Sequence, residues 1–174
     1  GFCRNSAFWA KMAFGNRPTN IIMKKESLKV KKARAEHIIK RLTISYPHAK
    51  IALRYSNNWE LLVAVILSAQ CTDKKVNEIT PLLFRTYRTL EDYVNADPKE
   101  FEKIIHPTGF YRAKTKNILA TAKILKEQFG GNIPRTMLEM LTLRGVARKT
   151  ANVVLGNAYG IVEGIAVDTH VQRL

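Results

Sequence analysis

The sequence predicts an all-α fold, because helix signals follow one another along the chain and no segment alternates apolar and polar residues as a strand does. Its 174 residues are 46% hydrophobic, which is enough for a domain with a buried core. From residue 27 onward, capping residues precede apolar runs, and glycine or proline follows them. The sequence shows no internal repeat and no apolar run long enough to span a membrane. We therefore expect roughly six to eight helices joined by short turns.

The first expected helix begins after Ser27 and reaches about Ser45. Asn57 with Glu60 has the spacing of a capping box and predicts a second helix over 59–69. This second helix is apolar nearly all round, so we expect it to be central.

The middle of the chain predicts a series of further helices. Three of them begin after Thr72, Thr89 and Asp97, and Pro81 is expected to disturb the first of the three. A long helix over about 111–129 follows, and a pair of glycines ends it.

The chain is organised around the stretch 143–155, which reads LRGVARKTANVVL. A short helix capped by Thr136 leads into this stretch, Gly145 breaks that helix, and a second helix starts at about Ala147 or Arg148. The first N–H groups of a helix have no partner within it, and the positive end of the helix dipole lies behind them. The tight hairpin between the two helices therefore predicts a phosphate-binding site.

The net charge of +15 is unevenly distributed. Residues 1–56 hold 13 Lys and Arg against 2 acids, residues 57–109 hold 6 against 8, and residues 110–149 hold 9 against 2. A generally basic, solvated surface is the alternative explanation. Because one basic block ends at the predicted phosphate site, we expect a nucleic-acid partner.

Three segments resemble the signatures of the endonuclease III-like family of helix-hairpin-helix DNA glycosylases. The hairpin is similar to the familiar Leu-Pro-Gly-Val-Gly/Ala-Arg-Lys-Thr-Ala-Asn-Val-Val, with Arg144 in place of proline and Ala147 where many relatives have glycine. The other two segments are 61–73 (LLVAVILSAQCTD) and 164–171 (GIAVDTHV). They follow in the family's order, and the resemblance runs over 27–174.

The resemblance implies a six-helix barrel domain and part of a second helical domain. We expect the barrel at 57–160, with the helix-hairpin-helix at 136–158. The amino-terminal helix and connector of the second domain would occupy 23–56. The loop with the catalytic aspartate and the start of the carboxy-terminal helices would occupy 161–174. Residues 1–22 fit poorly with the rest and are expected to be a non-native or disordered leader, with a targeting peptide as the alternative.

Lys149 and Asp168 are the candidate catalytic residues. Taken alone, Lys149 is a plain phosphate contact and Asp168 an ordinary helix cap. A lysine beside Arg148 at the positive end of a helix is also a candidate nucleophile. The resemblance implies that Lys149 attacks the sugar carbon that bears the damaged base, after which a Schiff base forms and β-elimination cuts the strand. It also implies that Asp168 stabilises positive charge on that sugar and accepts the proton of the lysine.

The resemblance further implies residues that contact DNA. Gln70 would fill the gap left by the extruded nucleotide, and Phe110 would wedge into the opposite strand, although Phe110 fits the core equally well. Lys114 is expected either to contact DNA or to be solvated. Thr72 and Asp73 would shape the base pocket. The remaining expected DNA contacts are Arg112, Arg144, Gly145, Val146, Ala147, Arg148 and Thr150.

Together these features predict a base-excision repair DNA glycosylase with AP lyase activity on oxidised pyrimidines, and the chain itself is expected to be an impaired fragment. A mismatch-specific glycosylase of the same superfamily and a non-catalytic helix-hairpin-helix DNA-binding module are the alternatives. Asp168 and the segment around Gln70 speak against the binding module, which needs neither. The expected partner is double-stranded DNA with a damaged base. We expect a monomer, without membrane association, that is associated with the nucleoid in the cytoplasm of a prokaryote.

The same resemblance raises the question of an iron–sulfur cluster. Family members usually carry a [4Fe–4S] cluster on the pattern Cys-x6-Cys-x2-Cys-x5-Cys. This chain has two cysteines, Cys3 and Cys71, which form no metal-binding pattern. We therefore expect no metal or cofactor in this chain and interpret it as a family member truncated before the iron–sulfur region.

Overall fold

The computed structural model describes residues 26–167, and every regular element among them is helical. The all-α prediction is thereby confirmed. The chain divides into two units, residues 1–49 and residues 50–174, which are described separately.

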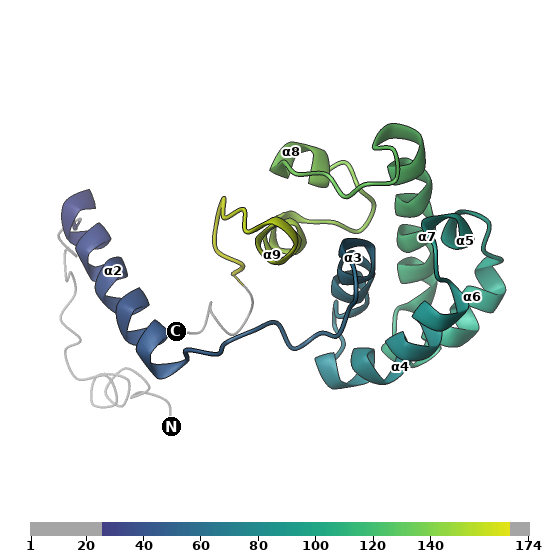
Figure 1. Cartoon of the computed structure of the whole chain (residues 1–174), viewed down its shortest axis with the longest axis horizontal. Helices are drawn as coiled ribbons and strands as arrows, with labels where there is room; N and C mark the ends of the chain where they lie inside the picture. Colours follow the sequence, from purple (N-terminus) through teal and green to yellow (C-terminus); the bar gives the residue numbers. More distant parts are fainter. Residues whose placement is uncertain (1–25, 168–174) are drawn as a thin grey trace, which may run out of the picture. The chain divides into compact units, whose positions relative to one another are not determined.

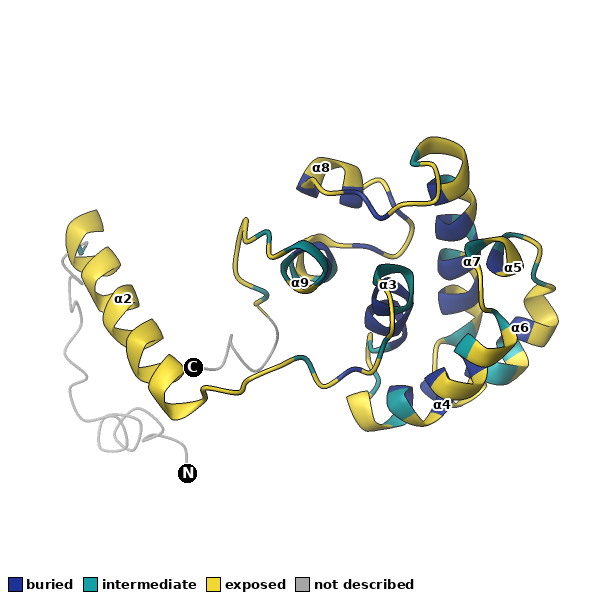
Figure 2. Ribbon diagram, viewed as in Figure 1, coloured by how far each residue is buried: buried dark blue, intermediate teal, exposed yellow. Residues whose placement is uncertain are grey.

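The first unit contains one described helix, α2 (Leu28–Ser45). It begins where the sequence predicts, because the side chain of Ser27 accepts a hydrogen bond from the N–H of Val30. None of its residues is buried, as its uniform exposure in Figure 2 shows. Its apolar side chains are exposed too, with exposed fractions of 49% for Ile38 and 52% for Leu42.

The second unit holds the remaining described helices (Figure 1), all of them short or of moderate length apart from one long helix. In chain order they are α3 (Asn58–Leu67), α4 (Asp73–Thr86), α5 (Leu90–Val94), α6 (Pro98–Ile105), the 3₁₀ helix η1 (His106–Thr108), α7 (Tyr111–Gln128), α8 (Met137–Met140) and α9 (Arg148–Tyr159).

The predicted caps account for where these helices begin. Asn57, Thr72, Thr89, Asp97 and Thr136 each accept a hydrogen bond from a backbone N–H in the first turn that follows. The cap of α5 is a complete capping box, in which the side chains of residues 89 and 92 are each bonded to the other's backbone. Local sequence chemistry therefore sets most of the helix boundaries.

One expectation about these helices is wrong. Pro81 does not interrupt α4, which is continuous from Asp73 to Thr86. Its ring lies on the exposed side of the helix, while Val76, Ile79 and Leu83 are buried on either side of it in the sequence. Packing of this apolar face holds the helix together across the hydrogen bond that proline cannot make.

The core of the second unit is built around α3. All seven residues from Leu61 to Leu67 are buried, and α3 packs against α4, α7 and α9 (Figure 2). Fully burying one such Leu, Val or Ile side chain contributes about 1.5–3 kcal/mol. The helix expected to be central is therefore central, and its carboxy-terminal end fixes where the following residues, 68–73, leave the core.

Candidate DNA-binding and active site

The hairpin between α8 and α9 presents the start of α9 to solvent. Ala147 is the N-cap residue, with extended backbone (φ −95°, ψ 172°), and its methyl side chain cannot cap the helix. Ala147, Arg148 and Lys149 are all exposed. The positive end of a helix of 12 residues, flanked by two cationic side chains, is thus open to an anion.

Gly145 is required for the turn of this hairpin. Its φ of +75° is in the left-handed region, which glycine adopts without strain. A Cβ at this position would lie 2.8 Å from Nδ2 and 2.9 Å from Cβ of Asn117 on α7, closer than such atoms pack. The turn therefore passes against α7 at a distance that only glycine permits.

Two further groups fix the hairpin in place. The hydroxyl of Thr121 on α7 donates a hydrogen bond to the carbonyl oxygen of Arg144 at 2.9 Å. Val146 buries its side chain in the core, and its N–H donates to the carbonyl oxygen of Leu143 within the turn. Val146 therefore helps to hold the turn, and its expected contact with DNA stays a prediction.

A cavity of about 390 Å³ lies beside the start of α9. Its volume falls within the range of about 300–1,000 Å³ typical of ligand pockets. Both aliphatic and polar side chains line it. The lining residues are Ile51, Leu53, Val65, Ser68, Ala69, Gln70, Asp73, Lys149, Thr150, Val153 and Ala166.

Four of the residues singled out from the sequence meet at this cavity. Gln70 comes from the loop after α3, Asp73 from the first turn of α4, and Lys149 and Thr150 from the first turn of α9. An amine, a carboxylate, a carboxamide and a hydroxyl thus face one space whose remaining walls are largely apolar. Such a space suits a flat, polar-edged ring that enters from outside.

The backbone is left-handed at two residues expected to enter DNA. Gln70 (φ 52°) and Phe110 (φ 48°) are the non-glycine residues with positive φ in the described part of the chain. Residues other than glycine rarely adopt this backbone conformation, and those that do are often found at functional sites. Phe110 is 68% exposed, so of its two expected roles the core role is wrong.

Lys114 is neither solvated nor placed to contact DNA. It is 4% exposed, and its Nζ donates to the carbonyl oxygens of Leu67 at 2.8 Å and Thr108 at 2.9 Å. Burial lowers the pKa of this ammonium from its ordinary value. The sequence contains a signal that would have found it, because Lys114 is spaced as one face of α7 with the buried Ile118 and Leu125.

Three further predicted residues do not line this cavity or lie outside the described part of the chain. Thr72 caps α4 by accepting a hydrogen bond from the N–H of Lys75, and it does not line the cavity. Arg112 is exposed, with its Cζ 5.5 Å from the ring centroid of Tyr111. Asp168 lies outside the described residues, so its approach to Lys149 stays a prediction.

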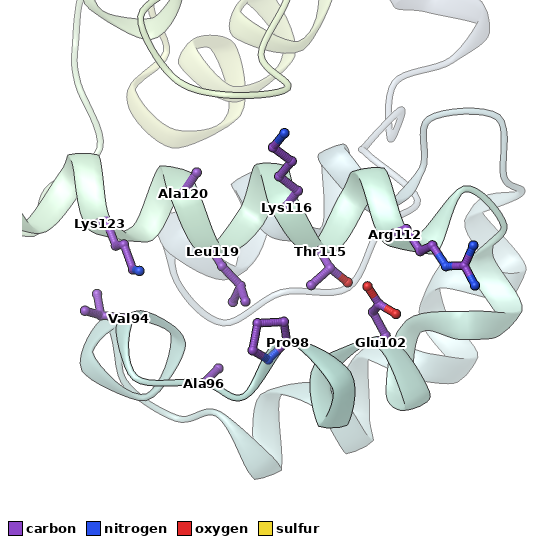
Figure 3. A pocket seen from close by; sticks show the side chains of 10 residues that line it. All are labelled: Val94, Ala96, Pro98, Glu102, Arg112, Thr115, Lys116, Leu119, Ala120 and Lys123. Atoms are coloured by element: carbon purple, nitrogen blue, oxygen red, sulfur yellow. The ribbon is translucent and has the colours of Figure 1, made fainter.

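Arg112 also belongs to a second cavity, which the sequence did not predict. This space of about 330 Å³ lies between α7 and the segment that joins α5 to α6 (Figure 3). Leu119 and Pro98 face each other across it, and Glu102 and Arg112 lie toward one end. None of the residues around the first cavity lines this one.

The residues of this chain do not fit the four-cysteine cluster that the resemblance implies. Cys3 lies outside the described residues, and the thiol of the half-buried Cys71 is 3.8 Å from the carbonyl oxygen of Thr72. Within residues 26–167, no group of three or more His, Cys, Asp or Glu side chains is arranged to hold a metal ion. None of the helices described there is long and apolar enough to cross a membrane.

Comparison with known proteins identifies the fold and the family. The model of the HhH-GPD superfamily of base excision DNA repair proteins matches residues 63–174. Endonuclease III of Synechocystis sp. is 51% identical over 144 residues, which are 83% of this chain and 66% of that protein. Endonuclease III of Bacillus subtilis is 47% identical over 139 residues, which are 80% of this chain and 63% of that protein. The chain thus spans somewhat less than two thirds of the length of these relatives.

A solved structure gives the same result for the fold. The structure of a trapped covalent intermediate between endonuclease III and DNA matches with a TM-score of 0.76 and 43% sequence identity. The match covers 82% of this chain and 66% of that one. The predicted helix-hairpin-helix glycosylase fold is therefore confirmed.

Proposed function

The chain belongs to the HhH-GPD superfamily of base excision DNA repair proteins, and on this premise we propose that it is an endonuclease III-like DNA glycosylase and AP lyase. Its substrates would be oxidised pyrimidines in duplex DNA. The observation that carries the proposal is the cavity beside α9, where Lys149 faces the same space as Gln70 and Asp73. Action as a monomer on DNA in the nucleoid belongs to the same proposal, as does the assignment of 57–160 to a barrel domain.

DNA binding would begin at the hairpin. A backbone phosphate accepts hydrogen bonds from the N–H groups at the start of α9, and Arg148 adds charge beside it. These contacts carry no sequence information, but they fix the register of the strand on the protein. The sugar next to the bound phosphate is thereby held close to Lys149, which is in the first turn of the same helix.

The damaged nucleotide would then leave the base stack. Its base enters the cavity, where Ile51, Leu53 and Val153 offer apolar walls and Asp73 offers a polar edge. Unstacking costs a few kcal/mol, so side chains must fill the hole that the nucleotide leaves. Gln70 and the exposed Phe110 are placed on strained loops that suit this work.

Lys149 would carry the chemistry. Its amine attacks C1′ of the sugar, the bond from C1′ to the base breaks, and the base departs with the electron pair and takes up a proton. The nitrogen loses a proton, which Asp168 would accept, and the sugar ring opens to a Schiff base. Removal of a proton from C2′ then breaks the bond between C3′ and its oxygen, which cuts the strand. Hydrolysis of the Schiff base releases the lysine.

A product assay tests this proposal and separates it from both alternatives. The full chain, in excess, is incubated with a thymine-glycol duplex and with a matched T:G mismatch duplex. We expect the thymine-glycol strand to be cut with a β-elimination end and the mismatch strand to stay intact. Preferred release of mismatched thymine would overturn the substrate class, and binding without product from either duplex would overturn catalysis by this chain.

A further inference from the structure

Beyond this function, on which the inference rests, we propose that Lys114 is a positioning residue that fixes both DNA-entering loops at once. These wedge loops are residues 68–71, which carry Gln70, and residues 108–110, which carry Phe110. Lys114 itself would touch neither the DNA nor the damaged base.

The hydrogen bonds of Lys114 connect the roots of the two wedge loops. Its Nζ donates to the carbonyl oxygen of Leu67, the last residue of α3, and to that of Thr108, the last residue of η1. Leu67 precedes Gln70 by three residues, and Thr108 precedes Phe110 by two. Two loops some 40 residues apart in the sequence thus share one anchor.

The charge of Lys114 suits this position. Carbonyl oxygens at the end of a helix carry the negative end of its dipole and lack partners within the helix. An ammonium group with three N–H donors can satisfy two such carbonyls together, whereas a neutral aliphatic side chain satisfies neither. Because a buried charge is costly without hydrogen bonds, its two partners also fix the side chain of Lys114 itself.

The wedge loops need such an anchor because both contain a left-handed residue. Backbone conformations of this kind persist only where the surrounding structure enforces them. In the second loop, Thr108 is buried, and its hydroxyl donates to the carbonyl oxygen of Ile105 at 2.8 Å. The first loop has a 3.0 Å hydrogen bond from the N–H of Cys71 to the carbonyl oxygen of Ser68. These bonds shape each loop separately, and among the hydrogen bonds described for residues 26–167 only those of Lys114 join the two.

A common anchor has a direct consequence for base extrusion. Gln70 must enter the gap on the damaged strand while Phe110 enters the opposite strand, so the separation of the two side chains has to match the duplex. A displacement of ~1 Å in such a positioned group can cost about 100-fold in rate. Lys114 would keep this separation constant while the hairpin binds phosphate independently.

Lys114→Met tests the proposal, with Lys116→Met as the matched control. Both changes remove one positive charge from α7, but Lys116 is exposed whereas Lys114 is buried. Hydrogen exchange measured on the full chain without DNA should rise in both wedge loops in Lys114→Met and in neither loop in Lys116→Met. The hairpin at 143–147 should exchange as in the wild type. Unchanged exchange in either wedge loop would overturn the proposal.

A second readout follows extrusion itself. A duplex with 2-aminopurine beside the lesion becomes more fluorescent when the stack opens. We expect Lys114→Met to lose this rise and about 100-fold in single-turnover rate, yet to bind undamaged duplex like the wild type. Lys114→Arg, which keeps the charge and the donors, should recover part of both. An equal loss of affinity for undamaged DNA would instead identify a general structural role and overturn the proposal.

Failure of the anchoring proposal can be distinguished from failure of the proposed glycosylase function. If Lys114→Met loses helical content, Lys114→Gln replaces it in both measurements, since its neutral carboxamide keeps a polar group in the site but ends one bond short of the position of Nζ and cannot replace both bonds of the ammonium. One outcome is that hydrogen exchange rises in the wedge loops of the variant, while the wild-type chain never extrudes the base from a lesion duplex. This outcome would contradict the proposed function but not the anchoring. A wild-type chain that extrudes the base, with wedge loops indifferent to residue 114, would contradict the anchoring alone.

Discussion

The hairpin and the wedge loops would both meet DNA, but they are stabilised in different ways. The hairpin takes its shape from a glycine and packs closely against α7 at Asn117. The wedge loops hold left-handed residues that are not glycine, and a buried lysine on the same helix joins them. The hairpin is thus determined by steric fit, and the wedge loops by a charged side chain that reaches across the core.

Helix α7 connects these two regions. Lys114, Asn117 and Thr121 are spaced by three and four residues, so they lie along one face of the helix. The first of them contacts the roots of the wedge loops and the other two contact the hairpin. Side chains along one face of α7 therefore set the geometry of several segments that we propose to contact DNA.

The largest effect on the hairpin is expected from Gly145→Ala. The new Cβ would clash with Asn117 and would stand on a left-handed residue, which costs about 1–2 kcal/mol by itself. We expect a lower Tm and a loss of duplex affinity. Gly130→Ala is the control, since Gly130 is also left-handed but has no atom within 4 Å of an added Cβ. Equal losses in the two variants would show that the close packing on α7 has no part in the effect.

A smaller effect is expected when charge at the hairpin is removed. Arg148→Ala should weaken binding to duplexes of any sequence and reduce the slope of log affinity against log salt by ~1, because one phosphate contact is lost. Lys99→Ala, which removes an exposed charge from α6, should leave the slope unchanged. Titration of a labelled duplex at several salt concentrations measures both slopes. If Arg148→Ala and the wild type have the same slope, Arg148 does not contact a DNA phosphate.

The smallest effect is expected from Thr121→Val. This change removes the hydrogen bond to the carbonyl oxygen of Arg144 and should lower the free energy of unfolding by about 1 kcal/mol. Thr86→Val is the control, because its hydroxyl donates to the carbonyl oxygen of Leu82 at an exposed position. Urea denaturation measures both. If Thr121→Val leaves stability and duplex affinity unchanged, α7 does not support the hairpin through this bond.

The comparison also shows what the sequence can predict. Caps such as Ser27 and Thr89, the buried helix at 61–67 and the hairpin at Gly145 all follow from short-range chemistry, and the structure bears them out. The effect of Pro81 was predicted wrongly, because tertiary packing outweighs one missing hydrogen bond. Local rules fail where distant segments decide the outcome.

The candidate site shows the same difference between what local sequence predicts and what only the fold determines. The sequence identified Gln70 and Lys149 separately, but only the fold places them at one cavity. The helical spacing of Lys114 with Ile118 and Leu125 indicates its burial, but its two carbonyl partners lie 47 and 6 residues away in the sequence, and only the fold brings them to its Nζ. Phe110 could not be assigned to core or surface from its apolar character, since the turn that exposes it depends on how η1 meets α7.

The most direct measurement of the central claim, that Lys149 is the nucleophile, is covalent trapping. Borohydride is added to the full chain with a duplex that holds an abasic site, and a complex resistant to detergent is quantified. We expect trapping by the wild type and by Lys99→Gln. Lys149→Gln should trap nothing while keeping much of its affinity, because the backbone N–H groups of α9 still bind phosphate. Undiminished trapping by Lys149→Gln would contradict the account.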